Sequence, residues 1–233
     1  EAAMKLTTIA VDADDTLWQS EQYFRFTEEQ FAAVLSEHAE KQVLGEKLLA
    51  AERRNLGLYG FGIKGFVLSM IETAVEVTDG RVSGSTIGRI LEFGQSMLAH
   101  PIETLPGVRD TLENLHSRYR LVMVTKGDLF DQERKLAESG LGELFHAIEV
   151  VSRKDEDTYR RVFSAHGTGP AEGMMVGNSL KSDILPALSS GAWAAFIPHP
   201  LTWVLEHEET PGTHPRFHEL ERFDQILALL PAG

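Results

Sequence analysis

The amino-acid sequence predicts an α/β protein: a doubly wound, Rossmann-like parallel sheet with an all-helical domain inserted after its first strand. Two observations support this class. From about residue 105 onward, short apolar segments of strand length alternate with helical segments, which is the pattern of a parallel sheet covered by helices on both faces. One further strand-like segment, residues 6–11 (LTTIAV), is separated from these by a long stretch of helical character only.

The first strand-like segment is short and apolar, and it stops at Asp12, as expected for a buried parallel strand. No convincing strand lies between Trp18 and His100. Apolar residues at helical spacing instead predict helices over residues 21–35, 39–54, 66–77 and 86–100.

After Pro101 the pattern changes to alternating elements. Gly140 and Gly191 follow helical segments and are suitable C-caps. The crossover rule makes the strand–helix–strand connections right-handed. We expect helices over residues 108–118, 130–139, 155–166 and 183–190, and strands over residues 119–124, 147–151, 173–176 and 192–197. The expected domains are a core of residues 1–17 and 105–233 and a helical cap of residues 18–104.

Composition excludes several classes of function. The chain has 233 residues and a formal charge of −13, from 22 Lys and Arg against 35 Asp and Glu, which disfavours nucleic acid and anionic membranes as partners. The absence of cysteine excludes disulfides, thiolate metal sites and cysteine nucleophiles. With no apolar stretch of membrane-spanning length and no signal-peptide pattern, we expect a cytoplasmic protein, as a monomer or homodimer, that acts on a small molecule.

Polar side chains follow four of the predicted strands. The carboxyl ends of parallel strands meet at one edge of the sheet, where ligands bind. Each residue type is also common in turns and helix caps, but their convergence at four strand ends favours a site. Carboxylate, hydroxyl, amide and ammonium groups together suit Mg²⁺ beside a phosphate. These residues are Asp12, Asp14, Thr16, Thr125, Lys126, Lys154, Asn178 and Asp183.

In order and spacing, these residues resemble the four motifs of the haloacid dehalogenase superfamily, the aspartate-nucleophile phosphatases and their relatives. The helical insert lies where the C1 cap of that family lies. The motifs are Asp12-x-Asp14-x-Thr16-Leu17, then Thr125, then Lys154, then Gly177-Asn178-Ser179-x-x-Ser182-Asp183.

The resemblance implies roles for these residues. Asp12 would be the nucleophile that forms an aspartyl-phosphate, and Asp14 would act as general acid and then as general base. Lys154 would mask phosphate charge, and Thr125 with the amides near Lys126 would hold phosphate oxygens. The Mg²⁺ ligands would be Asp12, the Asp14 carbonyl and Asp183, with Asn178 binding directly or through water. Many relatives carry an acid in place of Asn178, so Asp183 is expected to be the surer ligand.

Asp14 favours phosphoester hydrolysis, because dehalogenating and phosphonate-cleaving relatives lack an acid two residues after the nucleophile. The expected activity is therefore a Mg²⁺-dependent phosphatase acting on a small phosphorylated metabolite. A phosphomutase, a 2-haloacid dehalogenase, and a receiver or scaffold protein without enzymatic activity remain the alternatives.

Two weaker patterns lie outside these motifs. Residues 60–65 match the dinucleotide fingerprint GxGxxG, but the strand that must precede it is missing, so a turn between cap helices is expected. Within the family resemblance, Lys64 would be a cap cation that faces the phosphoryl group and binds substrate. The histidines near the C-terminus match no zinc motif and indicate a polar surface loop. They are His199, His207, His214 and His218.

Overall fold

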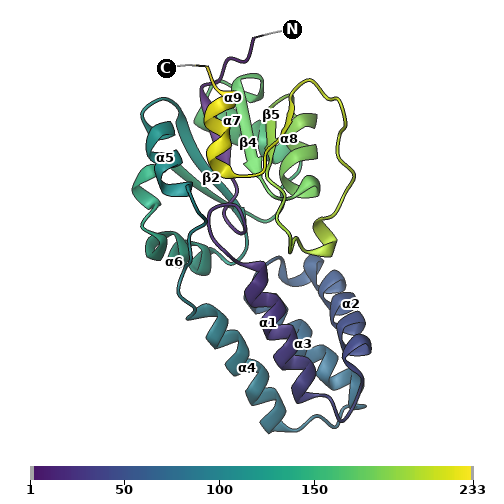
Figure 1. The fold of residues 1–233 in the computed structure, drawn as a ribbon. Helices are drawn as coiled ribbons and strands as arrows, with labels where there is room; N and C mark the ends of the chain where they lie inside the picture. The colour runs from purple at the N-terminus through teal and green to yellow at the C-terminus, as the bar shows by residue number, and fades with distance from the viewer. Residues whose placement is uncertain (1–2, 232–233) are drawn as a thin grey trace. The chain divides into compact units, whose positions relative to one another are not determined.

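The computed structural model describes residues 3–231, which form two compact units (Figure 1). The first unit comprises the residues up to Glu21, Ile102–Lys126 and the residues from Gln132 onward. The second comprises Gln22–Pro101 and the short segment Gly127–Asp131. Within residues 3–231, no helix combines the length and apolar character needed to cross a bilayer.

The first unit is built on a parallel sheet of six strands among the described residues. Val11 lies opposite Met123 on one side and Val176 on the other, so the first strand is central. The spatial order is β3 (Ala147–Val151), β2 (Arg120–Lys126), β1 (Thr8–Val11), β4 (Gly173–Gly177), β5 (Trp193–Phe196) and β6 (Phe217–Glu219).

This order places a topological switch point between β1 and β4, because the chain builds β2 and β3 on one side of β1 and the later strands on the other. Open α/β sheets bind ligands at such a point, beyond the carboxyl ends of the strands. Asp12 directly follows β1 and Asn178 directly follows β4, so both residues border it.

Both faces of the sheet are buried. Ile9 and Val11 contribute to one apolar cluster, which also contains residues of α5 (Val108–His116), α6 (Leu129–Ser139) and α9 (Ile226–Leu229). Ala10, between them, belongs to a second cluster with residues of α7 (Glu156–His166) and α8 (Leu185–Ser189). Because successive strand side chains point to opposite faces, a fully apolar strand is the sequence of a doubly covered sheet.

The predicted fold class is confirmed, with two local differences. The short strand β6 was not predicted, because Phe217–Glu219 contains a single apolar residue and gives no strand-like run. The helix predicted from Asp183 instead begins with a π-helical turn, Leu180–Ile184, before α8. The Ser179 side chain caps that turn by accepting a hydrogen bond from the Ser182 N–H group (3.0 Å).

The second unit is all-helical. Its core is formed by apolar side chains such as Phe31, Leu48, Phe66 and Met70. The predicted helices are present with shifted ends, and Gly57 lies inside a helix rather than ending it. The helices are α1 (Glu21–Val34), α2 (Lys41–Tyr59), α3 (Ile63–Val77) and α4 (Gly84–Leu98).

The glycine-rich segment forms the predicted turn between two helices of this unit, α2 and α3. Gly62 has a φ angle of 125°, and a Cβ atom there would lie 2.7 Å from Asp128 Oδ2. That oxygen accepts a hydrogen bond from the Lys64 N–H group (3.2 Å), so Asp128 caps α3. The glycine pattern is explained by this close approach. The expected contact of Lys64 with phosphate stays a prediction.

Two acidic side chains of the helical unit, Glu28 and Glu52, should make the folding stability of this unit depend on pH. Burial and then the charge of Glu28 raise the pKa of Glu52, on α2, to about 8. A carboxyl group with a raised folded-state pKa binds protons more tightly in the folded state, so it costs stability as the pH rises from about 4.5 to about 8.

We therefore expect the Glu52→Gln variant to gain stability relative to the wild type as the pH rises through this window. Urea unfolding at pH 5 and pH 8, followed by circular dichroism, measures the effect. Glu46→Gln, at an exposed position on the same helix, is the control and should show no such trend. The same difference between Glu52→Gln and wild type at both pH values would contradict the prediction.

Candidate active site

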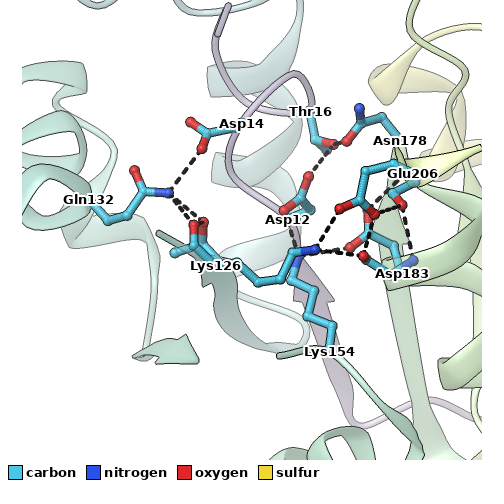
Figure 2. A network of polar contacts seen from close by, with 12 residues as sticks. Asp12, Asp14, Thr16, Lys126, Gln132, Lys154, Asn178, Asp183 and Glu206 are labelled. Carbon is cyan, nitrogen blue, oxygen red and sulfur yellow. Dashed lines mark hydrogen bonds and ion pairs between the residues drawn. The ribbon is translucent and has the colours of Figure 1, made fainter. Parts of the chain in front are cut away.

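Asp12 lies at the carboxyl end of β1, with its side chain 10% exposed. Its N–H group donates to the Val176 carbonyl (2.9 Å), which extends the pairing with β4 by one residue. One carboxylate oxygen, Oδ1, accepts from Lys154 Nζ (2.6 Å), and the other, Oδ2, accepts from the Thr16 hydroxyl (3.2 Å) (Figure 2). The carboxylate is thus fixed in orientation.

Lys154 lies between two buried carboxylates. Its ammonium group is 2.6 Å from Asp12 Oδ1 and 2.7 Å from Asp183 Oδ1, and its side chain is only 2% exposed. Burial alone would lower the pKa of Lys154, but the charges of Asp12 and Asp183 raise it above its usual value. Burial and the Asp183 charge raise the pKa of Asp12, and the Lys154 charge and its hydrogen bond oppose this rise. The carboxylates of Asp12 and Asp183 can lie this close together because the Lys154 ammonium group lies between them.

A set of oxygen ligands lies next to this triad. The terminal amide of Asn178 lies 2.9 Å from Asp12 Oδ2 and 3.2 Å from the Asp14 carbonyl oxygen. With its amino group toward them, the amide donates a hydrogen bond to each oxygen. With its oxygen toward them, carboxylate, carbonyl and amide oxygens converge, and this donor set suits a hard cation such as Mg²⁺.

Asp183 was expected to be the surer metal ligand, but both of its carboxylate oxygens already have protein partners. Oδ1 accepts from Lys154 and Oδ2 accepts from the Ser179 N–H group (3.0 Å). The roles of Asp183 and Asn178 as direct ligands both stay predictions. Within residues 3–231, no three His, Asp or Glu side chains form a metal site by themselves. A cation here would therefore need the backbone and amide oxygens.

The Asp14 carboxylate is surrounded by three hydrogen-bond donors. Trp18 Nε1 (2.8 Å) and Lys135 Nζ (3.1 Å) donate to Oδ1, and Gln132 Nε2 (3.0 Å) donates to Oδ2. Burial opposes ionisation, but the Lys135 charge and the hydrogen bonds from Trp18 and Gln132 hold the pKa of Asp14 below its ordinary value. These contacts therefore favour the ionised form of Asp14.

Sequence reasoning missed Gln132 and Lys135. They are three residues apart on α6, so they lie on the same face of this helix. Gln132 Nε2 also lies 2.7 Å from the Thr125 hydroxyl and 2.9 Å from the Lys126 carbonyl. This single amide therefore connects the residues after β1 with those at the end of β2. In the sequence, the signal for these two residues was their spacing on one face of a helix, and this spacing matches no catalytic motif.

Thr125 and Lys126 lie together at the end of β2, as predicted. The Thr125 side chain is buried beside Gln132. Lys126 contributes its side chain as well as its backbone, because its ammonium group contacts Ser182 Oγ (2.7 Å) and Glu206 Oε1 (2.6 Å). Glu206 was not expected near the site, because it belongs to the segment that was predicted to be a surface loop.

The C-terminal histidines do not all lie on an exposed loop, which corrects that prediction. The His199 side chain is 10% exposed, and its Nε2 atom is 3.5 Å from Asp15 Oδ1. Asp15, with a φ angle of 62°, accepts hydrogen bonds from the Ser20 and Glu21 N–H groups and so precedes α1 as a cap. The segment that contains His199 thus meets the loop after β1 at Asp15.

Removing the cation between the two carboxylates should strongly destabilise the core. We expect Lys154→Met to lower the free energy of unfolding by about 3–5 kcal/mol at neutral pH, because two buried carboxylates then face each other without a cation. The loss should shrink at lower pH, where a carboxylate takes up a proton. Chemical denaturation measures this loss of stability. The control is Lys181→Met, at an exposed position of the π-helical turn that follows β4. Equal stabilities of the two variants would contradict this account.

Comparison with known proteins places the chain in a family. The model of the haloacid dehalogenase-like hydrolases matches residues 6–191. A haloacid dehalogenase-like family hydrolase from Xanthomonas campestris is 41% identical, with a TM-score of 0.86 over 98% of this chain and 92% of its own. No curated protein matches.

More distant structures share the fold. The proposed HAD-hydrolase YfnB from Bacillus subtilis, bound to magnesium, has a TM-score of 0.67 and 15% identity, over 98% of this chain and 100% of its own. L-2-haloacid dehalogenase from Xanthobacter autotrophicus, with chloropropionic acid covalently bound, has a TM-score of 0.66 and 18% identity, over 96% and 98%. With the family model matching most of its length, the chain belongs to the haloacid dehalogenase-like hydrolases.

Proposed function

We propose that this hydrolase is a Mg²⁺-dependent phosphatase that cleaves small phosphomonoesters through an aspartyl-phosphate on Asp12. The observation that carries the proposal is the second acid, Asp14, two residues after the nucleophile in the same loop. An alcohol leaving group needs a proton when its bond to phosphorus breaks, whereas a departing halide does not. A second acid in this position therefore favours phosphoester hydrolysis over dehalogenation.

In the first step, a carboxylate oxygen of Asp12 forms a bond to phosphorus while the bond from phosphorus to the alcohol oxygen breaks. The Lys154 ammonium group holds Asp12 Oδ1 at 2.6 Å and the Thr16 hydroxyl holds Oδ2 at 3.2 Å, so the carboxylate is oriented before the attack. Asp14 in its protonated form supplies the proton that the departing alkoxide takes, so its side chain must first leave the Lys135 ammonium group that favours its ionised form. The products are the free alcohol and an aspartyl-phosphate.

In the second step, Asp14 takes a proton from water, and the water oxygen attacks phosphorus. The bond between phosphorus and Asp12 then breaks, which releases inorganic phosphate and restores the Asp12 carboxylate, while Asp14 is again protonated. Asp14 is held by Trp18, Gln132 and Lys135 in the structure, so this role requires its side chain to leave those donors and turn toward the substrate.

Because the protein is strongly acidic, cationic groups at the site must offset the negative charge of the phosphate. Lys154 and Lys126 provide cationic groups at the site. The Thr125 hydroxyl donates to the Lys126 carbonyl (3.2 Å) in the structure, and it would turn from there to donate to a phosphate oxygen. Mg²⁺ fits beside Asp12 Oδ2, the Asp14 carbonyl and the Asn178 amide, where it would neutralise phosphate charge. The structurally similar Bacillus subtilis protein is described as bound to magnesium, which supports this choice of metal.

The proposal predicts that the protein hydrolyses p-nitrophenyl phosphate when Mg²⁺ is present. Chelation with EDTA should remove the activity, and added Mg²⁺ should restore it. Release of p-nitrophenolate measures turnover, and 2-chloropropionate is the comparison substrate. Chloride release from that compound, with no hydrolysis of any phosphomonoester in a metabolite panel, would overturn the proposed function.

Substitution of the two acids should separate their roles. We expect Asp12→Asn to abolish turnover, because the nucleophile is lost. Asp14→Asn should slow turnover by about 10²–10⁴-fold while Mg²⁺ still binds, since the backbone carbonyl remains. Calorimetry with Mg²⁺ and steady-state kinetics measure these effects.

The matched control is Asp157→Asn, whose side chain is 90% exposed on α7 and which should behave as wild type. Loss of Mg²⁺ binding in Asp14→Asn would contradict the division of roles between its side chain and its backbone. Unchanged turnover in Asp12→Asn would show that the nucleophile is assigned to the wrong residue.

A further inference from the structure

Glu206 brings a further acidic side chain of the core unit to the residues at the site. It ends a short helical turn, Val204–Glu206, in the segment between β5 and β6, and its side chain is only 13% exposed. Its carboxylate contacts Lys126 Nζ (2.6 Å), the Ser179 hydroxyl (2.6 Å) and the Ser182 hydroxyl (Figure 2). None of the four family motifs includes it.

In the network that these contacts form, each hydrogen bond has a defined donor and acceptor. Lys126 Nζ donates to Ser182 Oγ (2.7 Å), so the Ser182 hydroxyl hydrogen is free to go to Glu206. Likewise, Ser179 Oγ accepts the Ser182 N–H group (3.0 Å) and donates its own hydrogen to Glu206. The Glu206 carboxylate accepts hydrogen bonds from all of these donors. The neutral amide of a glutamine at this position would turn its own N–H groups toward some of them.

The network holds the turn that carries the residues after β4. Ser179 and Ser182 lie between Asn178, beside Asp12, and Asp183, which accepts from Lys154. Asp183 Oδ2 also accepts the Ser179 N–H group (3.0 Å). Displacement of either serine would therefore move groups that contact Asp12 or Lys154.

Glu206 also balances the charge of Lys126. Burial lowers the pKa of Lys126, and the adjacent Glu206 carboxylate is the largest influence that opposes this change. The ion pair has both side chains only 13% exposed, so water screens it weakly. Without Glu206, Lys126 would lose the largest influence that opposes the effect of burial on its charge.

The segment that carries Glu206 is held in place independently. The Thr202 hydroxyl donates to the His199 carbonyl (2.9 Å), and the His207 ring contacts the Thr202 carbonyl (2.9 Å). His199 itself lies 3.3 Å from Gln19 Oε1, in the chain that follows Asp14. Glu206 therefore projects from an ordered support and not from a free loop.

From these contacts we propose that Glu206 is a positioning residue of the active site, which holds the Lys126 ammonium group and the Ser179–Ser182 turn so that Lys126 binds the phosphoryl group of the substrate. This inference rests on the proposed phosphatase function. It adds a side chain from the C-terminal segment to the machinery that the family motifs define, and it gives the Lys126 side chain a role beyond that of its backbone.

A double-mutant cycle in the full-length protein tests the proposal. The variants are Glu206→Gln, Lys126→Met and the double variant, with Glu208→Gln, at an exposed position of the same segment, as the matched control. Calorimetric titration with inorganic phosphate in the presence of Mg²⁺ measures binding, and p-nitrophenyl phosphate kinetics separate KM from kcat.

We expect Glu206→Gln and Lys126→Met each to weaken phosphate binding by about tenfold or more, with KM rising to match. The double variant should lose less than the product of the two single losses, because part of the effect of Glu206 passes through Lys126. Glu208→Gln should match the wild type. If Glu206→Gln unfolds at the assay temperature, Glu206→Asp, which keeps the charge with a shorter reach, replaces it in the same cycle.

Two results would overturn the inference alone: phosphate affinity in the Glu206 variant equal to that of Glu208→Gln, or losses in the double variant that multiply. In both cases a wild type that hydrolyses p-nitrophenyl phosphate leaves the proposed function standing. A wild type that neither hydrolyses phosphomonoesters nor binds phosphate would overturn the proposed function, and this inference with it.

Discussion

The buried ammonium group of Lys154 between Asp12 and Asp183 is the interaction on which the rest of the site depends. Three charges lie in a region from which water is almost excluded, and each is tolerable only because the others are present. Satisfying them requires three separate chain segments, after β1, β3 and β4, to arrive within hydrogen-bond distance. The parallel sheet achieves this because it brings the carboxyl ends of its strands to one edge.

The surrounding backbone is shaped by this requirement. A Cβ atom at Gly177 would lie 2.2 Å from Asp183 Oδ2, so only glycine at the end of β4 lets that carboxylate approach the strand. The π-helical turn that follows and the Ser179 cap then direct Asp183 toward Lys154. The serines of that turn in turn meet Glu206, so the charged triad extends through hydrogen bonds to the C-terminal part of the chain.

Much of this could be predicted from the sequence, and the limits have physical causes. Strands such as β1 are continuous apolar runs, and their ends are marked by Asp12 or Gly177, so the α/β class and the motif residues were accessible. Gln132 and Glu206 were not, because side chains of these types at helical or loop positions are usually solvated. Their contacts with Asp14 and Lys126 span long sequence separations that no local pattern records. The strand β6 has too few residues to give a pattern.

The central claim is that Asp12 attacks phosphorus directly, and the stereochemical course of hydrolysis tests it. A phosphomonoester made chiral at phosphorus with sulfur and oxygen isotopes would be hydrolysed in isotopically labelled water, and the configuration of the released thiophosphate determined. Two in-line displacements, first by Asp12 and then by water, predict net retention of configuration. Net inversion would mean that water attacks phosphorus in one step, and it would contradict the covalent role assigned to Asp12.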